Sequence, residues 1–314
     1  MPELPEVETT VKGLKKQVVG LIITDVWTDL AVKNQATKHY RDTLKDADFF
    51  AYFKKEVVGQ KITGAQRRAK NILIELANKQ TILVHMKMTG HMMTGMYDYD
   101  KKKNTWTVSP LEKNDALRDP YNRFIHVVFT LQPVRQDLTG CTYLVLCDSR
   151  KFAKVTLLKT DEDNKKHLGT LGPEPLDTKF TEKDFKERLQ KKLSGKVKTV
   201  LLEQSIIAGI GNIYSDEMLW LASIHPERKV CDVTNTEFKK MYDAMHTVLV
   251  KGIDFGGDST SDYRNILGEK GAFHGTHNVY RKTKTPCGKR GCRGIIERKM
   301  IGGRSAHFCP VHQK

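Results

Sequence analysis

The chain of 314 residues carries 53 lysines and arginines against 37 aspartates and glutamates, a formal net charge of +16. This balance favours a polyanionic partner, usually nucleic acid, although a merely basic soluble protein remains an alternative. A mean hydropathy of −0.49 and the lack of a long apolar run exclude a membrane span. The first residues contain no basic segment followed by an apolar one, so no secretion signal is expected.

The chain opens with Pro2-Glu3-Leu4-Pro5-Glu6-Val7. If Met1 is removed, Pro2 carries a secondary α-amine, and α-amines have a pKa of about 7.7–8.0. A fraction of that amine is uncharged near neutral pH and can attack an electrophilic carbon, with the Glu3 carboxylate adjacent for proton transfer. The alternative is structural, because Pro5 suits the first turn of a helix and Pro2 then merely follows the start.

Periodicity predicts a leading helix followed by strands. Val7, Val11, Leu14 and Val18 share one face of a helix over residues 3–19. Between residues 21 and 158, short β-branched runs separated by turns predict an antiparallel sandwich or barrel. The predicted strands are Leu21–Thr28, Lys61–Gly64, Asn71–Leu76, Thr81–Met88, Arg123–Leu131, Thr142–Leu146 and Ala153–Leu158. Residues 92–121 are polar and turn-rich, which predicts a surface insertion.

The second half predicts helices. Residues 161–179 combine a charged run with two prolines and two glycines, which indicates a linker. Capping boxes at Thr181/Asp184 and Thr234/Glu237 mark two helix starts, the second helix ending at Gly256-Gly257. Further helical stretches are predicted over residues 197–207 and 213–222.

The six cysteines fall into two groups. Three are scattered and are expected to be buried or free thiols in a reduced compartment: Cys141, Cys147 and Cys231. The others form a C-x4-C-x16-C-x2-H pattern: Cys287, Cys292, Cys309 and His312. Two ligand pairs across a hairpin predict a tetrahedral zinc site, which is structural because four protein ligands leave no position for an activated water. Residues 281–304 contain nine basic side chains and one acidic, which favours phosphate contact; a zinc ribbon that only stabilises the terminus is the alternative.

Three weaker signals have common structural alternatives. Gly209-x-Gly211-Asn212 opens onto a helix, where free N–H groups can bind phosphate, but plain helical turns look the same. The basic turn Arg67-Arg68-Ala69-Lys70 could place Lys70 over a phosphate or a sugar, but solvated turns are frequent. Side chains near strand ends could wedge between base steps or fill the space of a removed base, but such residues are more often core: Met88, Arg150 and Phe152.

Taken together and in this order, these motifs resemble the formamidopyrimidine-DNA glycosylases of the Fpg/Nei family. The blocks that carry the resemblance are Pro2–Thr9, Gln66–Lys70, Met88–Gly90, Asp148–Phe152, Leu171–Leu176, Gly209–Tyr214 and Gly302–Ser305. They extend over nearly the whole chain. Leu4 separates the chain from the endonuclease VIII branch, which usually has glycine at this position.

The resemblance implies roles for the matching residues. Pro2 would attack C1′ of the damaged nucleotide, and Glu3 would act as acid/base and ring-opening partner. Lys70 would hold phosphate at the lesion and assist. Met88, Arg150 and Phe152 would fill the void after base flipping. Asn212, in a helix–two-turn–helix motif, and Arg304, in the zinc hairpin, would bind the flanking phosphates. Arg304 would also be one of the catalytic residues. Residues 268–275 match a mobile loop that covers a flipped purine.

The expected fold is α+β and multidomain. It comprises an N-terminal catalytic antiparallel β-sandwich with a leading helix (1–160), a linker (161–179), a helical helix–two-turn–helix domain (180–256), a lesion-recognition loop region (257–283) and a zinc-finger β-hairpin (284–314). The expected function is a bifunctional DNA glycosylase/AP lyase of base excision repair. It would remove 8-oxoguanine and formamidopyrimidines from duplex DNA through a Schiff base on Pro2, followed by β,δ-elimination.

The expected partner is damaged double-stranded DNA, the expected cofactor is one structural Zn²⁺, and a cytoplasmic, nucleoid-associated monomer is expected. Three departures from the family pattern stand out. The zinc site has C-x4-C and His312 in place of two C-x2-C pairs, residues 92–121 are inserted, and a His-Asp-His-like segment is missing around Asn122-Arg123-Phe124. Two alternatives stay open: the same fold acting on oxidised pyrimidines, and a non-catalytic DNA-binding zinc protein.

Overall fold

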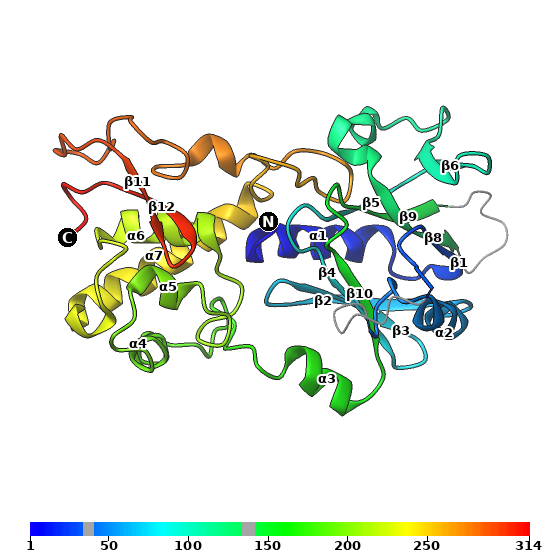
Figure 1. The fold of residues 1–314 in the computed structure, drawn as a ribbon, viewed down its shortest axis with the longest axis horizontal. Helices are drawn as coiled ribbons and strands as arrows, with labels where there is room; N and C mark the ends of the chain where they lie inside the picture. The colour runs from blue at the N-terminus through cyan, green and yellow to red at the C-terminus, as the bar shows by residue number, and fades with distance from the viewer. Residues whose placement is uncertain (34–40, 134–141) are drawn as a thin grey trace. The chain divides into compact units, whose positions relative to one another are not determined.

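The computed structural model describes residues 1–33, 41–133 and 142–314, so Cys141 lies outside the described residues. The chain divides into two compact units (Figure 1). The sandwich unit contains Met1–Pro2, Glu6–His167 and Gly256–Gly271, and the helical unit contains Glu3–Pro5, Leu168–Phe255 and Ala272–Lys314. Among the described helices, none has both the length and the apolar character that crossing a membrane requires.

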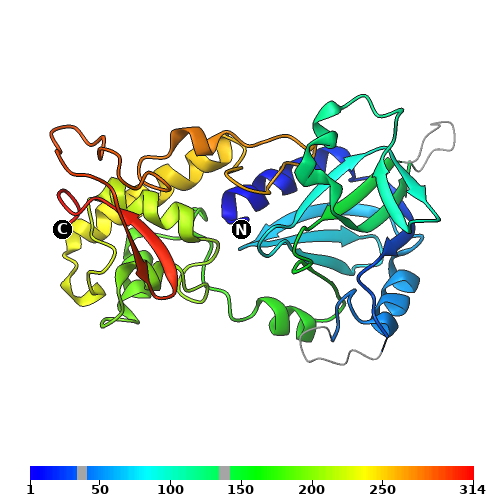
Figure 2. The same cartoon turned by 45° about the horizontal axis from the view of Figure 1, so that its top comes forward.

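The sandwich unit contains the antiparallel sheets that the sequence predicts (Figure 2). One sheet has the order β1 (Ile22–Thr28), β8 (Ile125–Gln132), β9 (Thr142–Cys147) and β5 (His91–Gly95). The other has the order β10 (Lys154–Leu158), β4 (Thr81–His85), β3 (Asn71–Leu76) and β2 (Ile62–Arg68). Aliphatic side chains of both sheets form one buried cluster, so the short β-branched runs form strands because they bury a shared core.

Two helices pack onto this core. Helix α1 (Leu4–Gln17) confirms the predicted leading helix, and its apolar stripe is fully buried. Helix α2 (Ala47–Val57) was not predicted. Asp46 caps its first turn by accepting from the N–H groups of Asp48 and Phe49, and Phe53 and Val57 are buried. Capping by Asp46 and the helical spacing of buried residues therefore explain α2.

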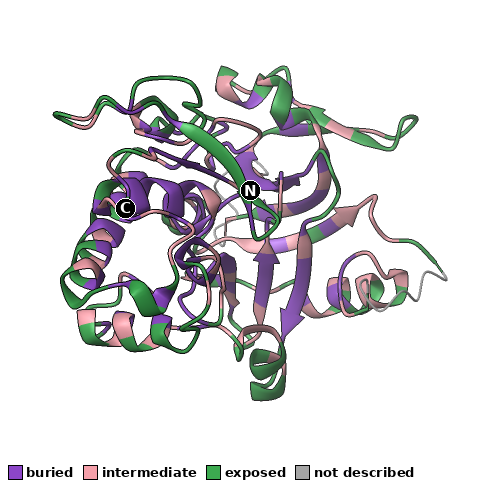
Figure 3. Cartoon of the chain, turned by 60° about the vertical axis from the view of Figure 1, so that its left-hand side comes forward, coloured by how far each residue is buried: buried purple, intermediate pink, exposed green. Residues whose placement is uncertain are grey.

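The stretch expected to be a surface insertion is more structured than predicted. It contains β5, a hairpin of β6 (Tyr97–Asp100) and β7 (Thr105–Val108), and the 3-10 helices η1 (Asp115–Arg118) and η2 (Pro120–Arg123). The hairpin turn, residues 101–104, is exposed at every position. Figure 3 colours the chain by burial, with exposed residues in green. Tyr97 and Leu117 instead join a buried cluster with Met93 and Val128. This stretch is therefore polar in composition yet contributes to a core.

The predicted linker also begins with a helix, α3 (Asp161–Leu168). Asp163 accepts from the N–H groups of Lys159 and Thr160, and the Asp163 N–H donates to the Thr160 hydroxyl. This reciprocal capping explains how a charged run without buried residues forms a helix.

The helical unit contains α4 (Glu182–Gln190), α5 (Val197–Leu201), α6 (Asn212–Ala222), η3 (Val230–Asp232), α7 (Asn235–Asp254), η4 (Phe273–Thr276) and the hairpin of β11 (Glu297–Ile301) and β12 (Arg304–Phe308). Both predicted capping boxes are present, at Thr181 and Thr234. The prediction for residues 197–207 was too long, because α5 ends at Leu201 and turns follow. The predicted five-part domain division stays a prediction.

Candidate active site and nucleic-acid interface

Pro2 and Lys70 both belong to the sandwich unit and are buried. Lys70 sits in the tight turn between β2 and β3, preceded by Ala69 at a φ of 54°. The predicted basic turn is shorter than expected, since Arg67 lies within β2. Arg67 forms an ion pair of 2.8 Å with Glu8 of α1 and donates to the Ala69 carbonyl at 3.2 Å. It therefore ties the Lys70 turn to the helix that follows Pro2.

His85, at the end of β4, was missed by the sequence interpretation. It pairs with Asn71, the residue after Lys70, across the sheet. Burial, together with the charges of Lys87 and Lys70, lowers the pKa of His85 to about 3. Its Nδ1 accepts a hydrogen bond of 3.0 Å from the Lys87 N–H. His85 is therefore neutral at physiological pH and offers an Nε2 donor. A histidine at a strand end, across the sheet from the Lys70 turn, was the available signal.

Asp148 organises the predicted wedge residues. Its carboxylate accepts from the Thr89 hydroxyl, from the Arg150 N–H at 3.2 Å and from the Ala153 N–H at 2.6 Å. It thus fixes the loop of Arg150 and Phe152 and ties it to the turn that follows Met88. The Arg150 guanidinium lies 4.6 Å from the centre of the exposed Phe152 ring. Met88 follows β4 in a turn, so the prediction that it ends a strand was wrong by three residues.

Glu3 belongs to the helical unit, where it lies at the start of α6. Its carboxylate accepts from the N–H groups of Ile213 at 2.9 Å and Tyr214 at 3.4 Å. A side chain at Gly211 would place its Cβ 2.2 Å from the Glu3 carboxyl carbon. The glycine turn therefore leaves room for the Glu3 carboxylate, which accepts from these two N–H groups. The sequence had suggested that they would bind phosphate instead.

Asn212 and Arg304 are positioned by a buried charged network that the sequence interpretation also missed. Lys198 of α5 donates to the Asn212 carbonyl at 3.1 Å and pairs with Asp216 of α6 at 2.5 Å. Asp216 also accepts from the N–H of His307 at 3.0 Å, in the strand that begins with Arg304. Asp216 thus joins the helix of Asn212 to the hairpin of Arg304. The Asn212 Oδ1 is buried and has no hydrogen-bond partner among the described residues.

The hairpin turn that precedes Arg304 also has a steric requirement. Gly302 and Gly303 have φ values of 56° and 74°, a left-handed conformation suited to a two-residue turn. A Cβ on Gly302 would lie 2.4 Å from Thr199 of α5. The turn therefore approaches α5 closely and leaves Arg304 exposed.

The predicted metal ligands converge. Their ligand atoms all lie within 4.8 Å of one another: Cys287, Cys292, Cys309 and His312. The sulfurs of Cys292 and Cys309 are 3.6 Å apart, close to the spacing of about 3.8 Å that tetrahedral Zn–S bonds of about 2.3 Å require. The other His312 nitrogen, Nε2, lies 3.1 Å from the Trp220 carbonyl, so a proton there leaves Nδ1 as a ligand. The donor set therefore fits zinc.

Around the cluster, the Trp220 indole N–H donates to the Cys287 sulfur at 3.3 Å, and burial lowers the pKa of His312. A neutral imidazole is the form that binds a metal. Among the described cysteines outside the cluster, Cys147 and Cys231 are free thiols, as expected.

The stretch expected to be a flexible loop, residues 268–275, is held by hydrogen bonds near its start and by an aromatic contact further along. In the sandwich unit, the Asn122 amide donates to the Gly268 carbonyl and the Gly271 N–H donates to the Ser259 hydroxyl. In the helical unit, the Phe273 ring stacks on Tyr214 with ring centres 5.0 Å apart. Its proposed role over a flipped purine stays a prediction.

Comparison with known proteins agrees with this geometry. Residues 1–155 match the family model described as formamidopyrimidine-DNA glycosylase N-terminal domain, and residues 171–264 match the formamidopyrimidine-DNA glycosylase H2TH domain. The chain is 36% identical to the formamidopyrimidine-DNA glycosylase of Herpetosiphon aurantiacus, with 100% of both chains covered. It is 34% identical to that of Bacillus cereus, with 100% of this chain and 99% of the relative covered.

Solved structures give the same result. The Lactococcus lactis Fpg in complex with DNA that contains an abasic site has a TM-score of 0.79 and 32% identity, with 99% of both chains covered. An L. lactis Fpg mutant in complex with Fapy-dG-containing DNA has the same TM-score and identity, with 100% of both covered. Sandwich, H2TH domain and Cys/His cluster define a DNA glycosylase. The chain belongs to the formamidopyrimidine-DNA glycosylase family.

Proposed function

We propose that this DNA glycosylase removes oxidised purines, 8-oxoguanine and formamidopyrimidines, from duplex DNA and then cuts the strand, with Pro2 as its nucleophile. The observation that carries the proposal is the fixed Glu3 carboxylate, directly after Pro2 in the chain and held by the amides of Ile213 and Tyr214. A buried carboxylate at this position is a proton-transfer group beside an amine.

The proposed reaction begins with the uncharged Pro2 amine after Met1 has been removed. The amine forms a bond to C1′ as the C1′–base bond breaks, and the departing base receives a proton. Ring opening of the sugar, assisted by Glu3, gives an iminium between Pro2 and C1′. The iminium acidifies the C2′ proton, so β-elimination releases the 3′ phosphate and δ-elimination releases the 5′ phosphate. Water finally hydrolyses the imine and restores Pro2.

The other residues have supporting roles in this proposal. Lys70 holds phosphate at the lesion, and Asn212 and Arg304 bind the flanking phosphates, contacts that carry no sequence information. Met88, Arg150 and Phe152 occupy the space of the flipped nucleotide. The exposed ring of Phe152 under the Arg150 guanidinium is suited to stacking on bases. The hydrogen bonds of Asp148 keep this group in place before DNA binds.

We propose that Cys287, Cys292, Cys309 and His312 hold one structural Zn²⁺. The metal supplies stability to the short hairpin region, since four protein ligands close its coordination sphere. The chain's own contribution is to present Arg304 at the turn of β11 and β12. We further propose that the protein works as a monomer in the cytoplasm, associated with nucleoid DNA.

Borohydride reduction tests the mechanism, because it converts an imine into a stable bond. Protein shown by intact-mass measurement to lack Met1 is mixed with duplex DNA containing 8-oxoguanine opposite cytosine, and a covalent adduct at Pro2 is expected. The control is the same protein with Met1 retained, which should give no adduct. Absence of an adduct with the Met1-free protein would refute the mechanism. A parallel duplex with an oxidised pyrimidine decides substrate class: faster excision there would favour the endonuclease VIII-like alternative.

A further inference from the structure

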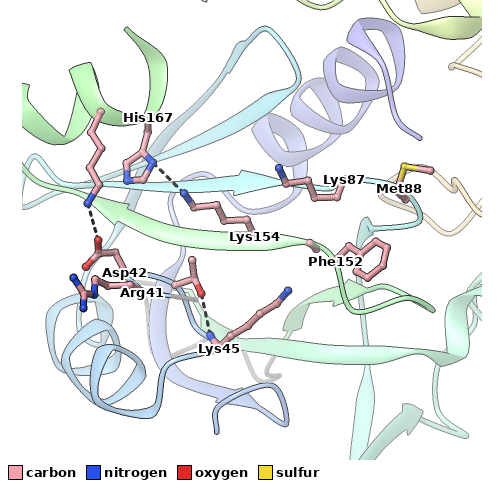
Figure 4. A pocket seen from close by; sticks show the side chains of 11 residues that line it. Arg41, Asp42, Lys45, Lys87, Met88, Phe152, Lys154 and His167 are labelled. Carbon is pink, nitrogen blue, oxygen red and sulfur yellow. Dashed lines mark hydrogen bonds and ion pairs between the residues drawn. The ribbon is translucent and has the colours of Figure 1, made fainter. Parts of the chain in front are cut away.

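A basic hollow of about 740 Å³ lies in the sandwich unit, apart from the residues assigned to catalysis (Figure 4). Met88 and Phe152 line it, as do the cationic side chains of Arg41, Lys45, Lys87, Lys154 and Lys166. The lysines come from different segments: Lys87 from the turn after β4, Lys154 from β10, and Lys166 from α3. The fold therefore gathers charges that are far apart in the sequence.

Few acidic groups balance these cations. Among the described lining residues, Asp42 is the one carboxylate, and it is already paired with Lys166 at 2.6 Å. Lys154 donates to His167 Nδ1 at 3.0 Å, a contact drawn in Figure 4, so His167 accepts as a neutral imidazole. Within the described part of the chain, neither Lys87 nor Lys154 has a carboxylate at ion-pair distance. An anion that enters the hollow would therefore meet several cations.

The electrostatics agree with this geometry. Burial lowers the pKa of Lys154, and the neighbouring charges of Lys87 and Lys166 lower it further. Burial likewise lowers the pKa of His167, with Lys154 and Lys166 contributing. The charged lysines repel one another in the protein by itself, and a bound anion would relieve that repulsion.

We propose that this hollow binds the phosphate groups of a ligand through Lys45, Lys87 and Lys154. Lysine ammonium groups bind phosphate as point charges and impose little geometry. The source of phosphate that the surroundings favour is the DNA backbone, because the walls of the hollow include Met88 and Phe152. That preference rests on their proposed role as wedge residues. A free polyphosphate presents the same chemistry and is the other source.

The test compares two triple variants with equal loss of charge. In the hollow variant, Lys45, Lys87 and Lys154 are each replaced by glutamine. In the control, glutamine replaces Lys101, Lys102 and Lys103, which lie in the exposed turn between β6 and β7. The affinity of the full-length protein for an undamaged duplex is measured over a range of salt concentrations. Each lost phosphate contact should reduce the slope of log K against log salt by about 0.9.

We expect the slope to fall in the hollow variant and to stay near the wild-type value in the control. The single variant Lys87→Gln, at an exposed position, should reduce the slope by about 0.9, the value for one phosphate contact. It keeps the test valid if the triple variant misfolds. Calorimetric titration with inorganic tripolyphosphate separates the two sources. Tripolyphosphate binding that the hollow variant loses, with an unchanged DNA slope, would assign the site to a free polyphosphate.

Wild-type slopes in both hollow variants, together with no tripolyphosphate binding by the wild type, would overturn the proposal. Borohydride trapping distinguishes this failure from failure of the proposed chemistry. If borohydride traps the adduct normally while the slope is unchanged and tripolyphosphate does not bind, only the proposed phosphate site is refuted. If the slope falls in the hollow variant but the Met1-free protein gives no covalent adduct, the Pro2 mechanism is refuted and the phosphate site is supported.

Discussion

The Glu3 carboxylate accepts a hydrogen bond of 2.9 Å from the backbone N–H of Ile213, which lies 210 positions later in the chain. The Ile213 N–H belongs to the first turn of α6, where helix amides lack partners within the helix and the helix dipole favours a negative charge. Two backbone N–H groups of a helix terminus therefore hold the residue next to the proposed nucleophile. Its position depends on the absence of a side chain at Gly211.

Gly211→Ala tests this dependence. The added Cβ would lie 2.2 Å from the Glu3 carboxyl carbon and must displace the carboxylate. Losing a positioned acid/base group typically costs about 10²–10⁴-fold in rate, so we expect base excision to fall by at least about 100-fold. Single-turnover excision of 8-oxoguanine measures the loss. A rate near the wild-type value would show that Glu3 placement is unimportant for excision.

Lys198→Met tests the buried network behind Asn212 and Arg304. Both Lys198 and Asp216 are essentially inaccessible to water, with exposed fractions of 0% and 1%, so the variant leaves a buried carboxylate without its lysine partner. We expect the free energy of unfolding to drop by about 3–5 kcal/mol in denaturant titrations. Lys183→Met is the matched control, because its pair with Glu187 is exposed and 3.9 Å long. It should change stability by less than about 1 kcal/mol. Equal effects of the two substitutions would contradict a structural role for the buried pair.

Local patterns in the sequence predicted much of the fold. The stripe from Val7 to Val18 marked α1, and the boxes at Thr181 and Thr234 marked helix starts. Helix α2 was within reach by the same reasoning, because Asp46 precedes apolar residues at helical spacing. The strands of the insertion were harder to predict, since β6 and β7 alternate polar and aromatic residues whose burial depends on distant partners.

The residues of the candidate site likewise divide into those that local patterns reveal and those that depend on distant partners. The four metal ligands come in two local pairs, and their convergence followed from spacing. The groups that position the site act across long separations instead. Asp148 reaches Thr89 over 59 positions, and Asp216 reaches His307 over 91. An acidic residue that accepts several backbone N–H groups leaves no local periodicity, so tertiary structure was needed to find it.

His85 gives a pH-dependent prediction. Burial, with help from Lys87 and Lys70, lowers its pKa to about 3 from an ordinary value of 6.5. Between these values the unfolded chain binds a proton that the folded chain does not, so His85 reduces stability as pH falls through this window. We expect His85→Gln to make the decline of the unfolding free energy between pH 6.5 and 4 shallower. Urea titrations at several pH values measure it, and parallel declines in both proteins would rule out the contribution of His85.

The Cys/His cluster gives a metal-dependent prediction. A Cβ on Gly294 would lie 2.3 Å from the Cys309 sulfur, so Gly294→Ala should push a ligand out of place. We expect Cys287→Ser and Gly294→Ala to lower the zinc content from one ion per chain and to weaken DNA affinity, because the Arg304 hairpin adjoins the cluster in sequence. The control is Cys231→Ser, an exposed free thiol outside the cluster, which should keep full zinc content and affinity. Elemental analysis and duplex titrations provide the two measurements. If zinc is lost while affinity is unchanged, the metal only stabilises the terminus and does not place Arg304 on the DNA.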